Sequence, residues 1–485
     1  MIYQILINNV SSQITPALDQ AVVNALRNKL SFEMPGIYYM KKINPYAGVK
    51  YFFTPKTQIF PTGLIHYVRD VLDLYKVPYE QVDMRKAPVL GPEIPLKGVQ
   101  LRDYQEDAVK RAVERQRGII KAGTGAGKSI TAASLIGKLN VPTILFIHKT
   151  DVFYQLINTL EDTLQVPIGK IGNGHCDIQR INVGMIQTIA RAFDPTLKAE
   201  EKDNEFLKEK GDVIRKVVQE AECLVADETH HLASDSFWTV YKAAEKAFYR
   251  YGFSGSPWRD DNATIMIEGG TAKQIIDIPA STLIDRGYLS PVDIYLYDFE
   301  HERQPKGIKY ATLYNTEIML KLERNNFIVN LALKAANSGK SVLIAVTKVE
   351  HGELLETLLK KQDKNAIFVH GESNNELRRK VLDGLSNHTQ KIAICTTIFG
   401  EGVDSPGLDV LINAKAGASS VDAFQLVGRV LRKTQAKKKA YVIDISDSGC
   451  RFFGQHSSER LKIYSTEPNY KLKFVKDISQ IVFDV

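Results

Sequence analysis

The chain has 485 residues and is 44% hydrophobic and 25% charged, as globular proteins usually are. Its longest apolar runs, such as VLIAV at 342–346, are too short to cross a bilayer, and we expect neither a membrane span nor a signal peptide. The net charge of +7 permits a polyanionic partner, and four widely spaced cysteines indicate neither a disulfide framework nor a zinc or iron–sulfur site and fit a reducing compartment.

Residues 1–97 differ in composition and pattern from the rest of the chain. They are rich in Tyr, Pro and Lys and lack a regular alternation of strand and helix patterns, so we expect a small accessory domain. Aromatic residues stand among lysines here, a pattern that suits stacking on nucleic-acid bases, with Lys41 and Lys42 as candidate DNA contacts. The alternative is that many of these aromatics form the core of a small β-rich domain; they are Tyr38, Tyr39, Tyr46, Tyr51, Phe52 and Phe53.

The segment LRDYQEDAV at 101–109 predicts the start of a helix. It places Arg102 and Gln105 at the start of this helix, one strand before the glycine-rich turn described next. A glutamine amide has both a donor and an acceptor, so Gln105 could read the edge of an adenine. Both residue types are also common on ordinary helix surfaces, which leaves this signal weak on composition alone.

The stretch GIIKAGTGAGKSITAASLI at 118–136 predicts a strand, a glycine-rich turn and a helix. AGTGAGKS fits the phosphate-binding pattern, with Ala122 where the strict form has glycine. Backbone amides at the start of the helix favour anions, Lys128 would hold the β- and γ-phosphates of ATP, and Ser129 would bind Mg²⁺. A chance glycine-rich turn is the alternative. The expected ATP-binding residues of the turn are Gly123, Thr124, Gly125, Ala126, Gly127, Lys128 and Ser129.

A second motif, CLVADETHHL at 223–232, ends a predicted buried strand in two acids. Asp227 can hold Mg²⁺ through water, and Glu228 can orient and deprotonate the attacking water. Buried carboxylates are costly, so two adjacent acids here indicate chemistry rather than packing, although an exposed strand end is the alternative. The preceding charged stretch at 191–222 is expected to be a solvated helical excursion within the first domain, with an ordinary surface helix as the alternative.

Short β-branched runs alternate with helical patterns from residue 98 onward. One series begins at residues 118, 143, 181, 223 and 251, and a second begins at 292, 341, 365, 391, 408 and 440. Such runs are typical of strands buried on both faces, so we predict an α/β fold with two parallel-sheet domains. Gly287 and Pro291 mark the break, which gives expected domains at 98–288 and 289–485.

In the second domain, FQLVGRVLRK at 424–433 places Arg429 and Arg432 on one helix face. Guanidinium groups that arrive from another domain can stabilise charge on the γ-phosphate; two solvated arginines are the alternative. The basic loop that follows, RKTQAKKKA, could bind phosphate or simply be solvated. FFGQHSSERLKIY at 452–464 predicts an amphipathic helix docked on the second domain, with Arg460 and Lys462 exposed.

Taken in order, these motifs resemble those of superfamily 2 helicases and translocases over residues 98 to about 447. LRDYQ resembles the adenine motif, AGTGAGKS motif I, DETH motif II, GFSGSPWRDD motif III, TTIFGEGVDSPGLD motif V and QLVGRVLR motif VI. The resemblance implies two RecA-like domains, ATP and Mg²⁺ bound between them, and a nucleic-acid strand across their top. It also implies site residues: ATP contacts at Gly402 and Asp404, a catalytic role for Gln425, coupling through His230, Ser254 and Ser256, and tentative DNA contacts at Lys149, Gln187, Thr188 and Thr396.

The combination of DETHH, SPWRDD and GEGVDSP resembles the XPB-like and restriction-motor groups more than DEAD-box RNA helicases. An aromatic and basic module before PTGLIHYVRDVL further resembles phage UvsW-type branch-migration helicases. The resemblance implies an ATP-dependent DNA helicase or translocase that remodels Holliday junctions, forks or R-loops in recombination, repair or replication, in the cytoplasm of the cell or, for a phage protein, of its host. The alternatives are an RNA helicase, the motor subunit of a restriction system, and a non-catalytic nucleic-acid-binding scaffold.

Overall fold

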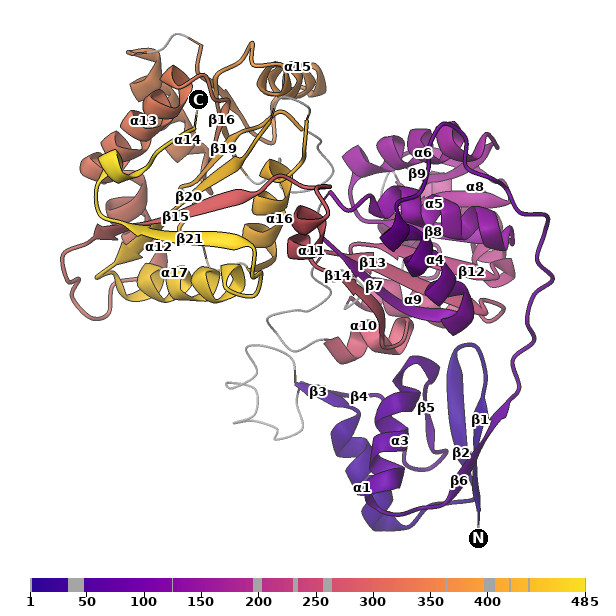
Figure 1. The fold of residues 1–485 in the computed structure, drawn as a ribbon. Helices are drawn as coiled ribbons and strands as arrows, with labels where there is room; N and C mark the ends of the chain where they lie inside the picture. Colours follow the sequence, from indigo (N-terminus) through magenta and orange to yellow (C-terminus); the bar gives the residue numbers. More distant parts are fainter. Residues whose placement is uncertain are drawn as a thin grey trace. The chain divides into compact units, whose positions relative to one another are not determined.

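The structure is a computed structural model that describes residues 2–33, 48–123, 125–194, 203–229, 234–255, 264–362, 365–396, 406–417, 420–434 and 437–484. The chain forms two compact units. Unit 1 comprises Met1–Ala122 and Gly127–Asp277, and unit 2 comprises Gly123–Ala126 and Ile278–Val485. Unit 1 therefore holds both the N-terminal module and the first α/β sheet (Figure 1). The limits expected from the sequence, at residues 97 and 288, stay a prediction.

The N-terminal module is built on a four-stranded sheet with the order β5-β2-β1-β6. β1 pairs antiparallel with β2 but parallel with β6, so the chain crosses over through helices. Helix α3 buries Val68, Val71 and Leu72, which are spaced three and four apart on one face. The elements are β1 (Tyr3–Ile7), β2 (Ser11–Thr15), α1 (Gln20–Lys29), β3 (Ser31–Glu33), β4 (Val49–Tyr51), β5 (Ile59–Pro61), η1 (Thr62–Leu64), α3 (Ile65–Leu74) and β6 (Tyr79–Asp83).

One expectation for this module is wrong. Strands and helices do alternate in it, but three of its strands have only three residues each, too few for a periodic signal. For the aromatic residues, the alternative is confirmed at two positions: Phe52 and Phe53 are 9% and 2% exposed and belong to the module's core. Tyr51 lies under a guanidinium, with Arg27 Cζ 4.4 Å from its ring centroid.

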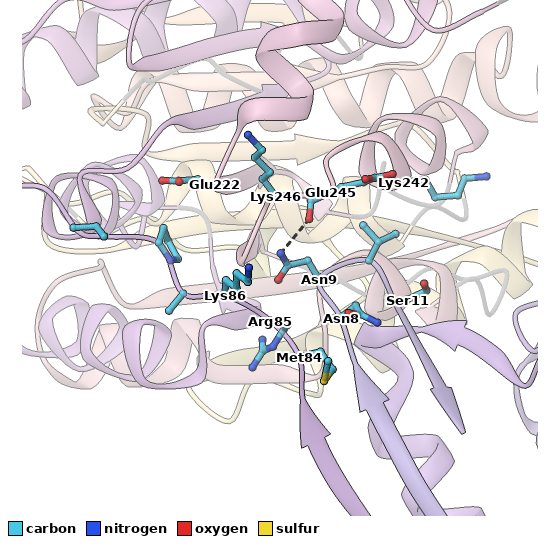
Figure 2. Close-up of a pocket in the computed structure, with 14 residues that line it drawn as sticks. Asn8, Asn9, Ser11, Met84, Arg85, Lys86, Glu222, Lys242, Glu245 and Lys246 are labelled. Carbon is cyan, nitrogen blue, oxygen red and sulfur yellow. Dashed lines mark hydrogen bonds between the residues drawn. The ribbon is translucent and has the colours of Figure 1, made fainter. Parts of the chain in front are cut away.

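The N-terminal module packs directly on the first α/β sheet domain within unit 1. Its hydrophobic core includes Ile265 and Met266 of helix α10 (Thr264–Gly270), with Trp238 packed against it. At the turn between β1 and β2, Asn9 Nδ2 donates to the Glu245 carbonyl oxygen at 3.0 Å (Figure 2). Polar contacts of Lys50 with Asp235 and of His66 with Glu268 add to the same joint.

The first α/β domain is an eight-stranded sheet with the order β10-β9-β11-β8-β12-β13-β7-β14. The ladders that join β9, β11, β8, β12, β13 and β7 are all parallel, and the short β10 is antiparallel to β9. The strands are β7 (Arg117–Ala122), β8 (Thr143–Ile147), β9 (Ile168–Gly172), β10 (His175–Asp177), β11 (Ile181–Met185), β12 (Cys223–Asp227), β13 (Tyr249–Ser254) and β14 (Gln274–Ile278). The remaining helices of this domain are α4 (Asp103–Arg115), α5 (Lys128–Leu139), α6 (Thr150–Leu164), α7 (Ile186–Arg191), α8 (Asp203–Glu220) and α9 (Asp235–Ala243).

Unit 2 contains a seven-stranded sheet with the order β17-β18-β16-β19-β20-β15-β21, and every ladder in it is parallel. The predicted α/β fold with two parallel sheets is thus confirmed. The strands are β15 (Val292–Glu300), β16 (Val342–Ala345), β17 (Ile367–Val369), β18 (Ile392–Cys395), β19 (Val410–Asn413), β20 (Ala440–Ser448) and β21 (Tyr470–Val475). The helices are α11 (Ala280–Asp285), α12 (Tyr310–Leu313), η3 (Tyr314–Met319), α13 (Leu322–Asn337), α14 (Val349–Lys360), α15 (Asn375–Ser386), α16 (Ser420–Val430), α17 (Arg451–Tyr464) and η5 (Ile478–Gln480).

Helix α17 docks on β20 as expected, but the expected exposure of Arg460 is wrong. Arg460 is 2% exposed, and its Nη2 donates to Asp444 Oδ1 at 2.7 Å. The pairing of two buried charges offsets the cost of removing each from water, which amphipathic periodicity alone does not reveal. Lys462 is exposed, as expected. No helix within the described ranges is long and apolar enough to span a membrane.

Candidate active site

The glycine-rich turn follows β7 and leads into α5. Gly125 and Gly127 have φ values of +85° and +75°, which residues with a Cβ adopt at a cost. Gly127 is also crowded, because a Cβ built on it would lie 2.5 Å from Gln105 Nε2. The amides at the start of the twelve-residue helix α5 fit a bound phosphate chain.

Lys128 and Glu228 meet at this turn. Lys128 Nζ lies 3.1 Å from Glu228 Oε1, and Ser254 Oγ donates to Glu228 Oε2 at 3.3 Å. Glu228 has a left-handed φ of +51°, a conformation that residues with a Cβ adopt at a cost. The carboxylate expected to activate water is therefore held between residues of two other predicted motifs.

Ser129 and Asp227 line one small cavity together with Lys128, above an apolar floor that includes Val225 and Phe253. The cavity measures about 10 Å³, the space of a single water-sized species. A hydroxyl and a carboxylate are the hard oxygen ligands that Mg²⁺ prefers, so this pair fits the ion. The parallel pairing of β12 with β13 sets Asp227 opposite Phe253 and brings both strand ends to the same edge of the sheet.

Gln105 ties helix α4 to the phosphate-binding turn. It is 4% exposed, its Oε1 accepts from the Arg102 amide at 2.9 Å, and its Nε2 donates to the Gly127 carbonyl oxygen at 3.3 Å. Arg102 Nη1 in turn donates to Tyr104 Oη at 2.9 Å. These bonds place the predicted adenine-reading residues beside the turn; whether they also read the base stays a prediction.

In unit 2, helix α16 carries two of the predicted catalytic side chains. Gln425 and Arg429 are each 7% exposed on this helix. Arg432 follows its end in a β-bridge with Leu289, and burial lowers its pKa to about 10. Guanidinium groups are costly to bury, so their position in this unit is consistent with an anionic ligand and does not fit the solvated alternative.

The expected DNA contacts of the first domain lie at one edge of its sheet. Lys149 and Thr188 follow β8 and β11, whose last residues, Ile147 and Met185, are register partners. Gln187 Nε2 lies 2.8 Å from Nδ1 of His148. His148 was not predicted as a site residue, although it adjoins Lys149. Thr396 follows β18 in unit 2 and is 7% exposed. Seven further expected site residues lie outside the described ranges: Lys41, Lys42, Thr124, His230, Ser256, Gly402 and Asp404.

The basic loop after α16 is partly structural. Lys437 is 7% exposed and donates to the carbonyl oxygens of Leu408 and Val430. Lys439 Nζ pairs with Asp293 Oδ2 at 3.2 Å. Of the lysines expected either to bind phosphate or to be solvated, these two do neither, because each is committed to a partner inside unit 2.

Two parts of the chain match known families. Residues 98–259 match the family described as type III restriction enzyme, res subunit, and residues 323–434 match the helicase conserved C-terminal domain. Both matches cover the segments that carry the motifs described above.

Related proteins carry helicase and translocase names. The chain is 23% identical over 451 residues to the DNA 3'-5' translocase XPB2 of Sulfurisphaera tokodaii, covering 86% of this chain and 93% of that one. It is 25% identical over 409 residues to the ATP-dependent DNA helicase uvsW of Enterobacteria phage T4, covering 77% and 76%. A helicase-like protein of Sulfolobus islandicus filamentous virus is 24% identical over 376 residues. The match covers 73% of this chain and 65% of the viral protein.

Among solved structures, the DNA-bound Type ISP restriction-modification enzyme LlaBIII has a similar fold. The TM-score is 0.56 at 14% identity, over 84% of this chain and 34% of that enzyme. At this identity the likeness concerns the fold alone.

Proposed function

Because the chain belongs to superfamily 2 of the helicases and is an ATP-hydrolysing DNA helicase, we propose that it remodels branched DNA by ATP-driven branch migration. The substrates would be four-way junctions, forks and R-loops. The observation that carries this proposal is the fixed docking of the N-terminal module on the first motor domain, through a shared hydrophobic core. A module held there can engage one arm of a junction while the motor tracks a strand of another.

The proposed ATP cycle uses residues of both units. In unit 1, Lys128 would hold the β- and γ-phosphates, Ser129 and Asp227 would hold Mg²⁺, and Glu228 would take a proton from the attacking water. Mg²⁺ would neutralise charge on the phosphates. In unit 2, Arg429 and Arg432 would stabilise charge that develops on the γ-phosphate, with Gln425 positioned on the same helix.

Ser254 would couple this chemistry to movement, because it bonds the carboxylate of Glu228 from the end of β13. Lys149, Gln187, Thr188 and Thr396 would contact the strand backbone, which carries no sequence information.

The test is a panel of duplex, forked, four-way and R-loop substrates incubated with ATP. Strand exchange on four-way junctions is expected, and activity confined to linear duplexes would contradict the proposal.

The family match of residues 98–259 favours a second candidate, the motor of a restriction system. In that role the chain would translocate along duplex DNA and would not remodel branched substrates. Displacement of a triplex-forming strand from a linear duplex, with no junction remodelling, would favour this second function over the first.

A further inference from the structure

A cavity of about 590 Å³ lies between the N-terminal module and the first motor domain, inside unit 1. Its size is in the range of ligand-binding pockets. Arg117, the first residue of β7, lines it, whereas the phosphate-binding turn follows the last residue of the same strand, Ala122. The cavity is thus separate from the nucleotide site, at the opposite end of β7.

The lining of this cavity is strongly basic, with Asp70 as its one acid. Asp83 pairs with Arg85 through two hydrogen bonds of 2.9 and 2.8 Å. His66 Nε2 lies 3.1 Å from Glu268 Oε2. Within the described parts of the chain, no carboxylate forms an ion pair with the other four basic residues, Arg69, Arg115, Arg117 and Lys273. The basic side chains are His66, Arg69, Arg85, Arg115, Arg117 and Lys273.

Arg117 carries a buried charge, and within the described ranges its hydrogen bonds go to backbone oxygens. It is 9% exposed, with Nε 2.7 Å from the Thr271 carbonyl oxygen and Nη1 3.3 Å from that of Asn9. Its register partner on β13 is Arg250, which is 2% exposed and likewise donates to carbonyl oxygens. Burial, then the charges of Arg250 and Arg85, lower the pKa of Arg117. Like charges on neighbouring strands are destabilising, and an anion in the cavity would offset that cost.

The basic lining continues beyond this cavity. Arg85 also lines a neighbouring cavity of about 810 Å³, beside Lys86 and opposite Lys242 and Lys246 (Figure 2). That second cavity also contains the carboxylates of Glu222 and Glu245, so its lining is mixed (Figure 2). A free anion would fill only the first cavity, whereas a chain of phosphates could extend through Arg85 into the second.

We propose that the cavity at the amino end of β7 is a phosphate-binding site for the DNA backbone of a duplex arm. The inference rests on the proposed function, since it takes branched DNA as the substrate. It adds where an arm is held: between the N-terminal module and the motor, away from the nucleotide. Any ligand there contacts both bodies at once, so it would also strengthen the joint between them.

The test uses one variant, called the cavity variant, in which three exposed basic residues are replaced together: Arg69→Ala, Arg115→Ala and Lys273→Ala. The buried Arg117 stays in place. The charge-matched control is Lys208→Ala, Lys210→Ala and Lys216→Ala on α8, which are also exposed. Affinity for a labelled blunt duplex is measured by anisotropy over a salt series. Each lost phosphate contact reduces the slope of log K against log salt by about 0.9, so a reduction of about two to three is expected for the cavity variant but not for the control.

A second arm asks whether the phosphate comes from DNA or from a small molecule. Thermal stabilisation by sodium tripolyphosphate is measured in a Lys128→Ala background, which removes the nucleotide site. Loss of that stabilisation in the cavity variant with unchanged duplex affinity would overturn the DNA assignment in favour of a free polyphosphate. If neither quantity differs from the control, the phosphate site is overturned. A third outcome separates this inference from the proposed function. If the variant loses duplex affinity as expected but the wild-type protein does not remodel junctions, the phosphate site stands and the proposed function is refuted.

Discussion

Lys128 and Glu228 form an ion pair across the predicted nucleotide site, with Nζ 3.1 Å from Oε1. The lysine expected to hold ATP is therefore neutralised by the carboxylate expected to activate water. Binding of the phosphates would draw Lys128 away and leave Glu228 held by Ser254. The pair would thus link nucleotide binding to release of the Glu228 carboxylate, the expected general base.

Glu228→Gln should preserve ATP binding and stop turnover. A neutral amide cannot accept the proton, and it holds Lys128 less tightly, so phosphate binding should be equal or better. We expect kcat to fall by roughly 10²- to 10⁴-fold, the usual contribution of a general base. Lys128→Ala should instead weaken ATP binding itself. Equilibrium nucleotide binding and single-turnover hydrolysis separate the two; a Glu228→Gln enzyme with a near wild-type rate would show that another group activates water.

Arg432→Ala should lower ATPase activity by roughly 10³-fold or more while the fold stays intact, as for other arginines that stabilise a transferring phosphoryl group. Arg432→Lys should restore little activity, because lysine lacks the planar fork. The change should appear in kcat more than in KM. Thermal unfolding provides the folding control, and ordinary turnover by Arg432→Ala would return the residue to a structural role.

Much of the fold could be predicted from the sequence, because strands buried on both faces give unbroken apolar runs. The runs at 143, 223 and 440 became β8, β12 and β20 of parallel sheets. The strands β4 and β5 could not be predicted, because three residues are too few to show the alternating pattern of a strand. Local sequence also cannot show pairing across the chain. Arg460 looks like a surface residue until Asp444 is seen beside it.

The same limit applies to the site. Lys128, Asp227 and Glu228 can be predicted because each belongs to a short local motif, a glycine-rich turn or a pair of acids, that directly follows an apolar strand run. The bond from Ser254 to Glu228 and the bond from Gln105 to Gly127 join segments far apart in sequence, and only the fold shows them. The basic cavity cannot be predicted from the sequence either, because Arg69, Arg115 and Lys273 are far apart in the chain and only the fold brings them together.

Lys437 should make stability depend on pH in the alkaline range. Burial lowers its pKa to about 8, below the ordinary value of 10.5. Between these values the unfolded chain binds more protons than the folded one, so the free energy of unfolding rises with pH. From pH 7 to 9.5 this group should add about 2 kcal/mol. Denaturant unfolding of wild type and Lys437→Gln at both pH values isolates the effect, and a constant difference between them would contradict it.

Gly63→Ala should separate the N-terminal module from the motor without removing it. Deleting residues 1–95 is a poor test of the module, because Trp238, Ile265 and Met266 of the motor would lose the apolar core that they share with it. At Gly63, a single added Cβ would lie 2.0 Å from the Glu268 carbonyl oxygen and 2.7 Å from that of Gly269. Backbone atoms cannot move aside as a flexible side chain can, so the joint must open, at a cost of about 1–3 kcal/mol.

We expect the Gly63→Ala protein to melt at a lower temperature, to keep ATPase activity stimulated by single-stranded DNA, and to lose most remodelling of four-way junctions. The matched control is Gly454→Ala on α17, where the nearest atom to an added Cβ is 3.5 Å away and alanine favours the helix by roughly 0.5–1 kcal/mol. The two variants carry the same chemical change at a tight and at an open position. Junction remodelling at the wild-type rate by a destabilised Gly63→Ala protein would show that the docked module does not engage the substrate. Loss of ATPase activity together with remodelling would show instead that the joint supports the motor itself.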